Sequence, residues 1–417
     1  MRSGWKSKPL GEATTFLNGL WKGEQPPFVT VGVIRNTNFA KDGSIDDSDV
    51  AWLDVEAKKF DKRKLKCGDI VLEKSGGGPK QPVGRVALFE KEEGNYSFSN
   101  FTSAIRVNDA QELDFRFLHK FLFWKYASGV TESMQSHSTG IRNLNADAYK
   151  EIAVPLPPLL EQQRIVSILD EAFAGLATAA ANAEKNFKSA RELFESYLRF
   201  ILTSDEATWE KKRLSEVAKE FGRGKSKHRP RNDPKLYGGP YPFVQTGDIS
   251  NADHWLTDYT QTYSVLGLAQ SRLWPKGTVC IAIVGATVGE TAILDFEACF
   301  PDSVIGIVVD DAVADNEFVE YLLQAFKAVL KEKGKGTARD NINLGTFEKQ
   351  LFPFPTLEGQ RQIVAQLNEL SSRKGELEDF YTKRLECISE LRQSILHKAF
   401  SGELTSPPSQ AIKEAAE

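Results

Sequence analysis

Apolar residues recur at alternating steps of three and four along two long stretches of the chain. The first stretch runs from Ile165 to Ile201, and the second runs from Ile363 to Ala399. This spacing is a heptad pattern, typical of a helix that packs along its length against another helix. The positions that we expect to form the seam are Ile165, Leu169, Leu176, Phe187, Phe194, Ile363, Leu367, Leu377, Leu385 and Ile395.

A proline cluster precedes each stretch and marks where each helix should begin, because proline is tolerated at a helix start and breaks an interior. The helices should end near Thr203 and near Gly402, a residue suited to a C-cap. Each would then have about 44 residues and a length of roughly 65 Å. In the second stretch, Lys374 and Arg392 do not fit the seam, although Leu391 can take the place of Arg392 at its turn.

The chain contains an internal repeat, and each copy includes one of the two apolar stretches. Residues 140–171 align without a gap on residues 338–369, which lie 198 positions later, so that Gln162 matches Gln360. Looser matches upstream, such as Trp5 with Trp209, drift in offset because of loop insertions. The chain therefore consists of two tandem units, each a variable domain followed by a better-matched helix.

Within the variable domains, short β-like runs follow glycine-containing turns, and helical spacing appears near each domain's end. We therefore predict an α+β fold with two mixed α/β domains and a pseudo-twofold tandem repeat. The two long helices would join the domains and pack as an antiparallel coiled coil. Pairing between chains, or burial of both helices as ordinary domain core, are the alternatives. The predicted divisions are a first domain at 1–157, a spacer helix at 158–204, a second domain at 205–355, a second spacer helix at 356–405 and a flexible tail at 406–417.

The composition is that of an ordinary soluble protein, with 41% hydrophobic and 26% charged residues. A net charge of −4 argues against a surface coated with positive charge, but it allows local basic patches. No continuous apolar run reaches the roughly 18 residues of a membrane span, so we expect no membrane association. The four cysteines are scattered without metal-ligand spacing, which favours reduced thiols in a cytoplasmic protein.

The second domain contains a basic segment rich in glycine and proline, within residues 222–243. Between Arg223 and Arg231 it has five lysines and arginines, one histidine and no acid. Such residues in a loop suit phosphate contact, and arginine can also bind guanine in the major groove. A solvated charge run is the alternative, but the apolar residues on both sides favour an ordered loop. The candidates for DNA contact here are Arg223, Lys225, Lys227, His228, Arg229, Arg231 and Gln245.

The first domain has two basic segments of its own, one at residues 58–66 and a glycine-rich one at residues 74–85. Glycines there would let backbone amides approach a phosphate closely, although a hairpin without any ligand is the alternative. The matching segment of the second domain, residues 284–290, is much less basic, so the two domains should read different sequences. The candidates here are Lys58, Lys59, Lys62, Lys74, Ser75, Lys80, Gln81 and Arg85, and Arg142 and Arg339 beside the matched segments are further ones.

Catalytic machinery is not visible in the sequence. The five histidines show neither metal-ligand nor catalytic-triad spacing, and no glycine-rich cofactor motif follows a predicted strand. We therefore expect no catalytic residue, metal or cofactor in this chain. Two other functions stay open: a stand-alone methyltransferase or nuclease, and a coiled-coil scaffold that does not bind DNA.

Four segments together resemble one known family over nearly the whole chain. They are PLPPLLEQQRIVSILDE, its second copy PTLEGQRQIVAQLNE, the basic segment GRGKSKHRPRNDPKLYGGPYPFVQTGDIS and the closing ELRQSILHKAFSGELT. The chain resembles the specificity subunit of type I restriction-modification enzymes. The second copy departs from the first at Gly359, where the first has Glu161.

The resemblance implies a division of labour among several subunits. Each variable domain would be a target-recognition domain that reads half of a bipartite, asymmetric DNA site, and the helices would set the gap between the halves. Two methyltransferase subunits would supply S-adenosylmethionine, and restriction subunits with translocase activity would use ATP and magnesium. Lengthening one helix by about one turn should then change the spacer in the recognised DNA sequence.

Overall fold

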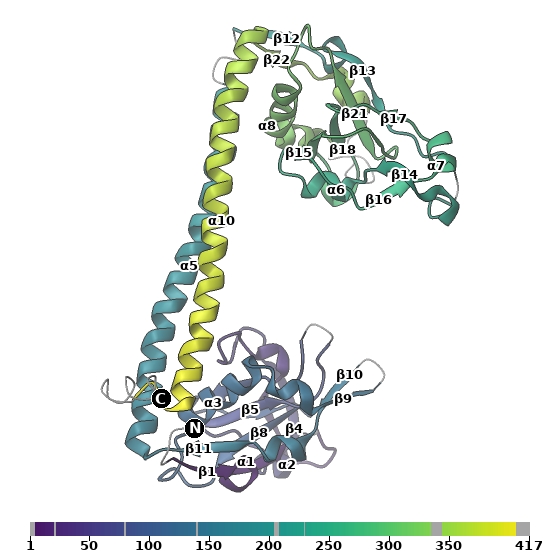
Figure 1. Cartoon of the computed structure of the whole chain (residues 1–417). Helices are drawn as coiled ribbons and strands as arrows, with labels where there is room; N and C mark the ends of the chain where they lie inside the picture. Colours follow the sequence, from purple (N-terminus) through teal and green to yellow (C-terminus); the bar gives the residue numbers. More distant parts are fainter. Residues whose placement is uncertain are drawn as a thin grey trace. The chain divides into compact units, whose positions relative to one another are not determined.

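The computed structural model describes residues 5–20, 22–78, 81–138, 141–203, 208–228, 230–334 and 344–405. The chain forms two compact units (Figure 1): unit 1 is Met1–Ala183 with Lys383–Glu417, and unit 2 is Glu184–Thr382. Each unit thus contains one variable domain and one end of both long helices. The predicted five-part division at 157, 204, 355 and 405 stays a prediction, and the tail at 406–417 lies outside the described residues.

Unit 1 is built around two small sheets. The first is antiparallel, with the order β2 (Thr14–Asn18), β8 (Thr102–Val107), β5 (Asp69–Glu73), β6 (Val86–Phe89). The second has the order β4 (Ala51–Glu56), β3 (Phe28–Ile34), β7 (Tyr96–Phe98). Two further pairs are β1 (Lys6–Pro9) with β11 (Ala153–Leu156), and β9 (Gln135–Ser138) with β10 (Ile141–Leu144). The short helices are α1 (Leu10–Ala13), α2 (Ala57–Asp61), α3 (Phe115–Ala127) and α4 (Ala146–Lys150).

Unit 2 has a larger version of the same arrangement. Its first sheet has the order β13 (Ala218–Arg223), β21 (Val304–Val309), β18 (Val279–Ala282), β19 (Thr291–Leu294), β15 (Trp255–Leu256). Its second has the order β16 (Gln261–Tyr263), β14 (Tyr237–Phe243), β20 (Ala298–Cys299), β17 (Leu273–Trp274). The remaining pair is β12 (Glu210–Lys212) with β22 (Phe352–Phe354). The helices are α6 (Thr246–Asn251), α7 (Val265–Ala269), α8 (Asn316–Gly334) and α9 (Leu344–Lys349).

The two units share one strand topology. The order β2-β8-β5-β6 in unit 1 recurs as β13-β21-β18-β19 in unit 2. In the second sheets, β3 pairs in parallel with β7, as β14 does with β20. These correspondences confirm the predicted tandem repeat of mixed α/β domains, although the loops between the strands differ.

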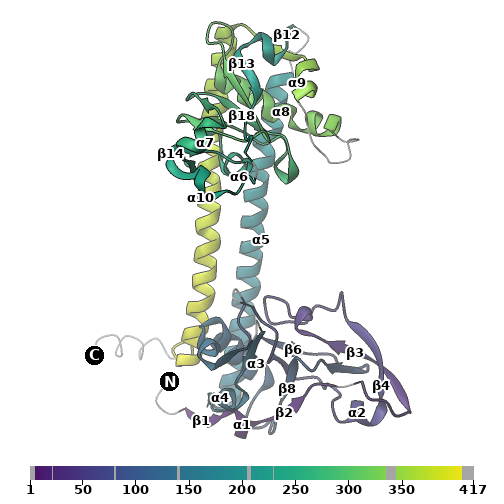
Figure 2. The same ribbon diagram turned by 90° about the vertical axis from the view of Figure 1, so that its right-hand side faces the viewer.

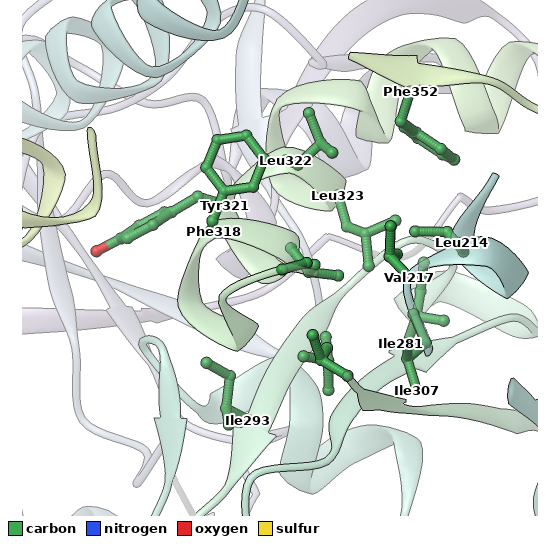
Figure 3. Close-up of a cluster of buried hydrophobic side chains, with 14 of the residues drawn as sticks. Leu214, Val217, Ile281, Ile293, Ile307, Phe318, Tyr321, Leu322, Leu323 and Phe352 are labelled. Carbon is green, nitrogen blue, oxygen red and sulfur yellow. The ribbon is translucent and has the colours of Figure 1, made fainter. Parts of the chain in front are cut away.

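The core of unit 2 lies between α8 and the first sheet. Phe318, Leu322 and Leu323 of α8 are fully buried, and they face Ile281 and Ile307 of the central strands (Figure 3). The helix thus presents residues about one turn apart, such as Phe318 and Leu322, to a sheet whose buried strands are almost wholly apolar. This packing fixes the positions of the strand ends from which the loops of unit 2 extend.

The long helices are α5 (Leu159–Thr203) and α10 (Leu357–Ser401), and within each unit they lie side by side (Figures 1 and 2). In unit 1, Leu169 near the start of α5 shares a core with Phe400 at the end of α10. In unit 2, Leu198 near the end of α5 shares a core with Leu367 near the start of α10. The helices therefore run in opposite directions in each unit, which confirms the predicted antiparallel pairing within one chain.

Most predicted seam positions face inward. Leu377 is the exception, because it is 44% exposed and lies outside the buried side of α10. The remaining positions are buried or half-buried: Ile165, Leu169, Leu176, Phe187, Phe194, Ile363, Leu367, Leu385 and Ile395.

The prediction that Lys374 and Arg392 do not fit the seam was wrong. The side chain of Lys374 is only 13% exposed, with its Nζ 2.8 Å from Asp253 Oδ1 and 5.0 Å from the centre of the Phe194 ring. Arg392 lies 4.8 Å from the ring centre of Phe173. Long aliphatic stems let both residues fill the seam while their charged heads meet aromatic faces. Leu391, the expected substitute, is 49% exposed.

Among the described residues, α5 is the one helix whose length and composition would allow it to cross a membrane. Only a small part of the apolar window within it is buried. Continuous apolar runs did not reveal this window because its alanines are interrupted by polar residues. The seam residues of the same helix pack into the protein core at both ends.

A matched glutamine ties each long helix to its own domain. Gln162 is fully buried; its Oε1 accepts from the backbone N–H of Asp114 at 2.8 Å, and its Nε2 donates to the carbonyls of Glu112 and Pro157. Gln360 makes the equivalent bonds to Asp315, Val313 and Pro355. The same hydrogen bonds to the backbone thus occur in both units, which explains why glutamine occurs at both positions.

Replacing Gln162 with alanine is expected to lower the free energy of unfolding by about 2 kcal/mol, because it leaves buried backbone groups without partners. Gln163, its exposed neighbour on α5, provides the matched control. Its alanine variant should change stability by less than about 0.5 kcal/mol. Urea unfolding measures both, and equal losses would refute the role assigned to Gln162.

Candidate nucleic-acid interface

The basic loop of unit 2 leaves β13 at Arg223 and reaches a short 3-10 helix, η4 (Pro234–Leu236). The Nε of Arg223 donates to the main-chain oxygen of Asp302 at 2.8 Å. The Nη2 of Arg231 donates to both carboxylate oxygens of Asp302, at 2.8 and 2.9 Å. Both arginines therefore anchor the two ends of the loop to a single turn of the protein.

The main chain of this loop is also held in place. A Cβ atom on Gly224 would lie 2.3 Å from the carbonyl oxygen of Phe300, so only glycine fits there. Ser271 donates from its hydroxyl to the carbonyl of Lys225 at 2.8 Å, and the N–H of His228 donates to Gln270 Oε1 at 3.0 Å. The loop thus follows a path defined by contacts with the segment that follows α7.

Two lysines of this loop point their charges into solvent. Lys225 and Lys227 are both exposed, and neither ammonium group has a hydrogen bond or ion pair with any described residue. The loop backbone is held by hydrogen bonds, whereas the two ammonium groups have no hydrogen-bond or ion-pair partner among the described residues. This combination suits contact with the phosphates of a nucleic acid.

His228 and Gln245 have partners within unit 2. His228 Nε2 lies 3.1 Å from Asp233 Oδ2. The pKa of the Asp233 carboxyl is lowered by a hydrogen bond from the backbone N–H of Lys235 and by His228. Gln245 Nε2 donates to Gln261 Oε1 at 2.6 Å. Both side chains therefore brace the surface beside the basic loop.

In unit 1, one group of candidates lies on α2 and at its C-terminal end. Lys58 and Lys62 are exposed, whereas Lys59 Nζ lies 3.5 Å from Glu56 Oε2. Phe60 of the same helix is buried in a small cluster with Val31 and Val55 of β3 and β4. This anchor on the inner side leaves the lysines on the outer side of α2.

The second group lies on the hairpin between β5 and β6. Lys74 is half-buried without an acidic partner among the described residues, and burial lowers the pKa of its ammonium group. Its backbone N–H and that of Ser75 donate to the carbonyl of Phe101, whose side chain is 47% exposed. Ser75 Oγ donates to Asn143 Oδ1 at 2.6 Å. A half-buried cation without a counter-ion in the described chain is a good candidate for anion contact.

Arg85 is bound within the protein instead. Its Nε lies 2.7 Å from Glu73 Oε2, and the side chain of Glu73 is only 1% exposed. Its Nη2 also donates to the carbonyl of Asn36 at 3.1 Å. With its oxygen turned toward the guanidinium, the amide of Gln81 accepts from Arg85 Nη1 at 2.8 Å. A contact between Arg85 and DNA would leave the buried carboxylate of Glu73 unpaired, which is costly.

Arg142 lies on β10, next to the same hairpin. Its carbonyl accepts from the N–H of Gly76 at 3.2 Å. The structure therefore brings Lys74, Ser75 and Arg142 together, whereas the lysines of α2 follow the edge strand of the other sheet. The remaining candidates Lys80, Arg229 and Arg339 lie outside the described residues.

Sequence reasoning missed a charged cluster beneath the surface of unit 2. His254 Nδ1 lies 2.7 Å from Glu320 Oε2, and His254 Nε2 lies 3.2 Å from Glu317 Oε2. Burial lowers the pKa of His254, but its hydrogen bonds to both glutamates outweigh this effect and raise it to about 9. Asn368 of α10 donates to Glu317 at 2.8 Å. No local pattern could reveal this cluster, because its members come from a loop, α8 and α10.

The chain matches the profile of the "Type I restriction modification DNA specificity domain" twice, over residues 4–185 and 206–386. These matches cover most of the chain. It belongs to this family. The specificity-subunit family comprises the non-catalytic DNA-recognition subunits of type I systems, and the predicted resemblance is confirmed.

Several named relatives of this specificity-subunit family align along nearly the full chain. The StySPI specificity subunit of Salmonella potsdam and the EcoKI specificity subunit of Escherichia coli are each 23% identical, over 96% of this chain and 89% of theirs. A putative MjaX specificity subunit of Methanocaldococcus jannaschii is 21% identical over 96% of this chain and 93% of its own.

Two solved structures share the fold of this specificity-family chain. One comes from a structural description of complex assembly and conformational transition of the type I R-M system, with 21% identity and a TM-score of 0.79 over 97% of this chain and 99% of that one. The other is the HsdS subunit from Thermoanaerobacter tengcongensis, with 20% identity and a TM-score of 0.57 over 97% and 98%. The comparisons support specificity-subunit membership and favour neither of the two other functions considered from sequence.

Proposed function

We propose that this chain recognises double-stranded DNA as the specificity subunit of a type I restriction-modification system, with each unit reading one half of a bipartite site. One observation carries the proposal: the same fold occurs twice, but its basic residues lie at different places. In unit 1 they are on α2 and the β5–β6 hairpin, and in unit 2 they are on the loop after β13. Like folds with unlike contact surfaces suit an asymmetric site with two different halves.

The proposed contacts with phosphates come from lysines whose ammonium groups have no partner among the described residues. Lys225 and Lys227 provide them in unit 2, and Lys58, Lys62 and Lys74 provide them in unit 1. Arg223 and Arg231 hold the loop of unit 2, and Arg85 holds the hairpin of unit 1. These arginines therefore position the contact residues.

The proposed partners supply the chemistry. Two methyltransferase subunits would bind this chain and hold S-adenosylmethionine, and restriction subunits with translocase activity would hold ATP and magnesium. We propose that the chain holds no cofactor of its own and works in the cytoplasm. Support comes from the family and from its four free thiols, Cys67, Cys280, Cys299 and Cys387.

A double variant, Lys225→Ala with Lys227→Ala, tests the proposal. Loss of two phosphate contacts should weaken binding to every duplex sequence, roughly tenfold near physiological salt. The slope of log affinity against log salt should also fall by about two, while the preferred sequence stays the same. Fluorescence anisotropy with labelled duplexes, on the chain bound to its methyltransferase subunits, measures all three quantities.

The matched control removes the same charge elsewhere. Lys185 and Lys383 are exposed on α5 and α10, and their double alanine variant should bind DNA as the unmodified chain does. A scaffold that does not bind DNA would show no salt-dependent binding with any variant. Equal losses in the two double variants would contradict the assigned contact set.

A further inference from the structure

One short helix occupies the same place in both units but differs in character. In unit 1, α2 follows the edge strand β4 and precedes the central strand β5. In unit 2, α7 follows the edge strand β16 and, after the short strand β17, precedes the central strand β18. On α2 the exposed residues include Lys58, whereas on α7 they include Val265 and Leu266.

Two adjacent apolar residues of α7 are exposed. Val265 is 68% exposed and Leu266 is 61% exposed, although they are neighbours on a five-residue helix. Adjacent exposed aliphatic side chains favour a binding role, because covering them with a partner removes apolar surface from water. Their exposure therefore marks α7 as a contact surface of unit 2.

The inner side of α7 rests on a rigid platform. Tyr263 and Phe243 stack with their ring centres 3.9 Å apart, and Leu268 of α7 packs against their cluster. A Cβ atom on Gly267 would lie 2.3 Å from the carbonyl oxygen of Leu236, so α7 approaches the backbone closely. Figure 1 shows α7 beside β14, from which Phe243 comes. Val265 and Leu266 are thus held by a fixed support, which suits recognition.

Two segments that carry lysines adjoin the ends of α7. Ser271 and Gln270, just after α7, hold the backbone of Lys225 and His228. Ser264, just before α7, donates to the carbonyl of Lys235, which is exposed. An apolar tip among cations fits the major groove of DNA, where thymine methyl groups lie between two rows of phosphates.

We infer that Val265 and Leu266 contact thymine C5-methyl groups in the major groove, and that they set part of the sequence read by unit 2. This inference rests on the proposed function. It requires at least one A·T pair in the half-site of unit 2. The equivalent helix of unit 1 presents Lys58, so the two halves of the site should differ at the corresponding base pairs.

Uracil scanning tests the inference directly, since uracil is thymine without its 5-methyl group. Methylation-motif sequencing of cells carrying this chain and its partner subunits first gives the two half-sites. Each thymine of that duplex is then replaced singly by uracil, and binding to the assembled complex is measured. We expect about a fourfold loss of affinity at one or two thymines, all in one half-site, as burial of one methyl group predicts.

The variant Val265→Ser with Leu266→Ser should bind the thymine duplex more weakly and lose nothing further at those same positions. The variant Lys225→Ala with Lys227→Ala should bind more weakly but keep its sensitivity to uracil. Because both serine substitutions are at exposed positions, the unfolding midpoint should stay unchanged, which separates recognition from folding.

The outcomes distinguish the two levels of the argument. A chain that yields no methylation motif and no sequence preference overturns the proposed function, and the inference with it. A clear motif without thymine, or with thymines that uracil replaces at no cost, overturns the inference alone. Equal sensitivity to uracil in the serine variant and the unmodified chain also overturns it.

Discussion

The substitution Glu320→Gln is expected to lower the free energy of unfolding of unit 2 by about 3 kcal/mol, because it removes the fully buried member of an ion pair and leaves protonated His254 with only the partly exposed carboxylate of Glu317. Glu320 is fully buried. Its carboxylate accepts from Thr291 Oγ1 and from Gln324 Nε2, each at 2.6 Å, and lies 2.7 Å from His254 Nδ1. Glutamine preserves the shape and removes the charge, so urea unfolding measures the electrostatic contribution.

The same ion pair gives stability a defined dependence on pH. The pKa of His254 is raised from 6.5 to about 9 in the folded chain, so folding favours the protonated imidazole. The stabilisation is therefore fully present below pH 6.5 and is lost as the pH rises through about 9. The charges facing His254 are Glu317 and Glu320 on α8, with Asn368 of α10 bound to Glu317. We expect the effect of Glu320→Gln to be larger at pH 6 than at pH 9.5.

An exposed glutamate provides the control for this prediction. Glu376 lies on the outer side of α10 within unit 2, and its glutamine variant should change stability by less than about 0.5 kcal/mol at either pH. If Glu320→Gln destabilises unit 2 equally at pH 6 and pH 9.5, the ionised pair with His254 is not what stabilises the cluster.

The corresponding helix of unit 1, α3, buries a histidine where α8 buries Glu320. His119 of α3 follows Phe117 and Leu118, as Glu320 of α8 follows Phe318 and Val319. Burial lowers the pKa of His119 to about 4, so its imidazole is neutral at physiological pH. Both of its ring nitrogens lack hydrogen-bond partners among the described residues. The two units thus share a fold while differing in the charge buried beneath it.

The fold was predictable where its causes are local. Proline clusters and heptad spacing located α5 and α10, because backbone restriction and helical periodicity act within a few residues. The same periodicity wrongly placed Lys374 outside the seam. Its partner Asp253 belongs to the domain of unit 2 and not to either helix, so helical spacing alone could not reveal the contact. The periodicity also wrongly placed Leu377 in the seam, because the half-buried positions at that turn are Lys374 and Glu378.

The loop conformation of the basic segment was predictable from sequence, but the partners of its charged residues were not. Glycine and proline content correctly indicated a loop around Lys225. Whether a lysine or arginine has an ion-pair partner depends on acids far away in the sequence. Asp302, 71 residues from Arg231, binds that arginine, and buried Glu73 binds Arg85 across a hairpin. The apolar pair on α7 was also missed, since its exposure depends on how Gly267 and Leu268 pack beneath it.

Adding one helical turn to both long helices is expected to lengthen the spacer between the two DNA half-sites by one or two base pairs, leaving the half-sites unchanged. Four residues inserted between Ala183 and Glu184, and four between Thr382 and Lys383, extend α5 and α10 where each passes from one unit to the other. Each insertion adds about 6 Å, close to the rise of two base pairs, and turns the helix by about 40°, close to the twist of one. Methylation-motif sequencing reads the result directly.

Both helices must be extended together, because they pack antiparallel and a single insertion would shift Phe194 out of register with Lys374. From sequence, lengthening one helix was expected to change the spacer; the antiparallel packing predicts instead that an insertion in α5 alone destabilises the chain and abolishes methylation of the site. The same four residues placed in the exposed turn at Glu92–Glu93 of unit 1 should leave the motif and spacer unaltered. An unchanged spacer after the double insertion, with methylation intact, would show that the paired helices do not set the distance between the half-sites.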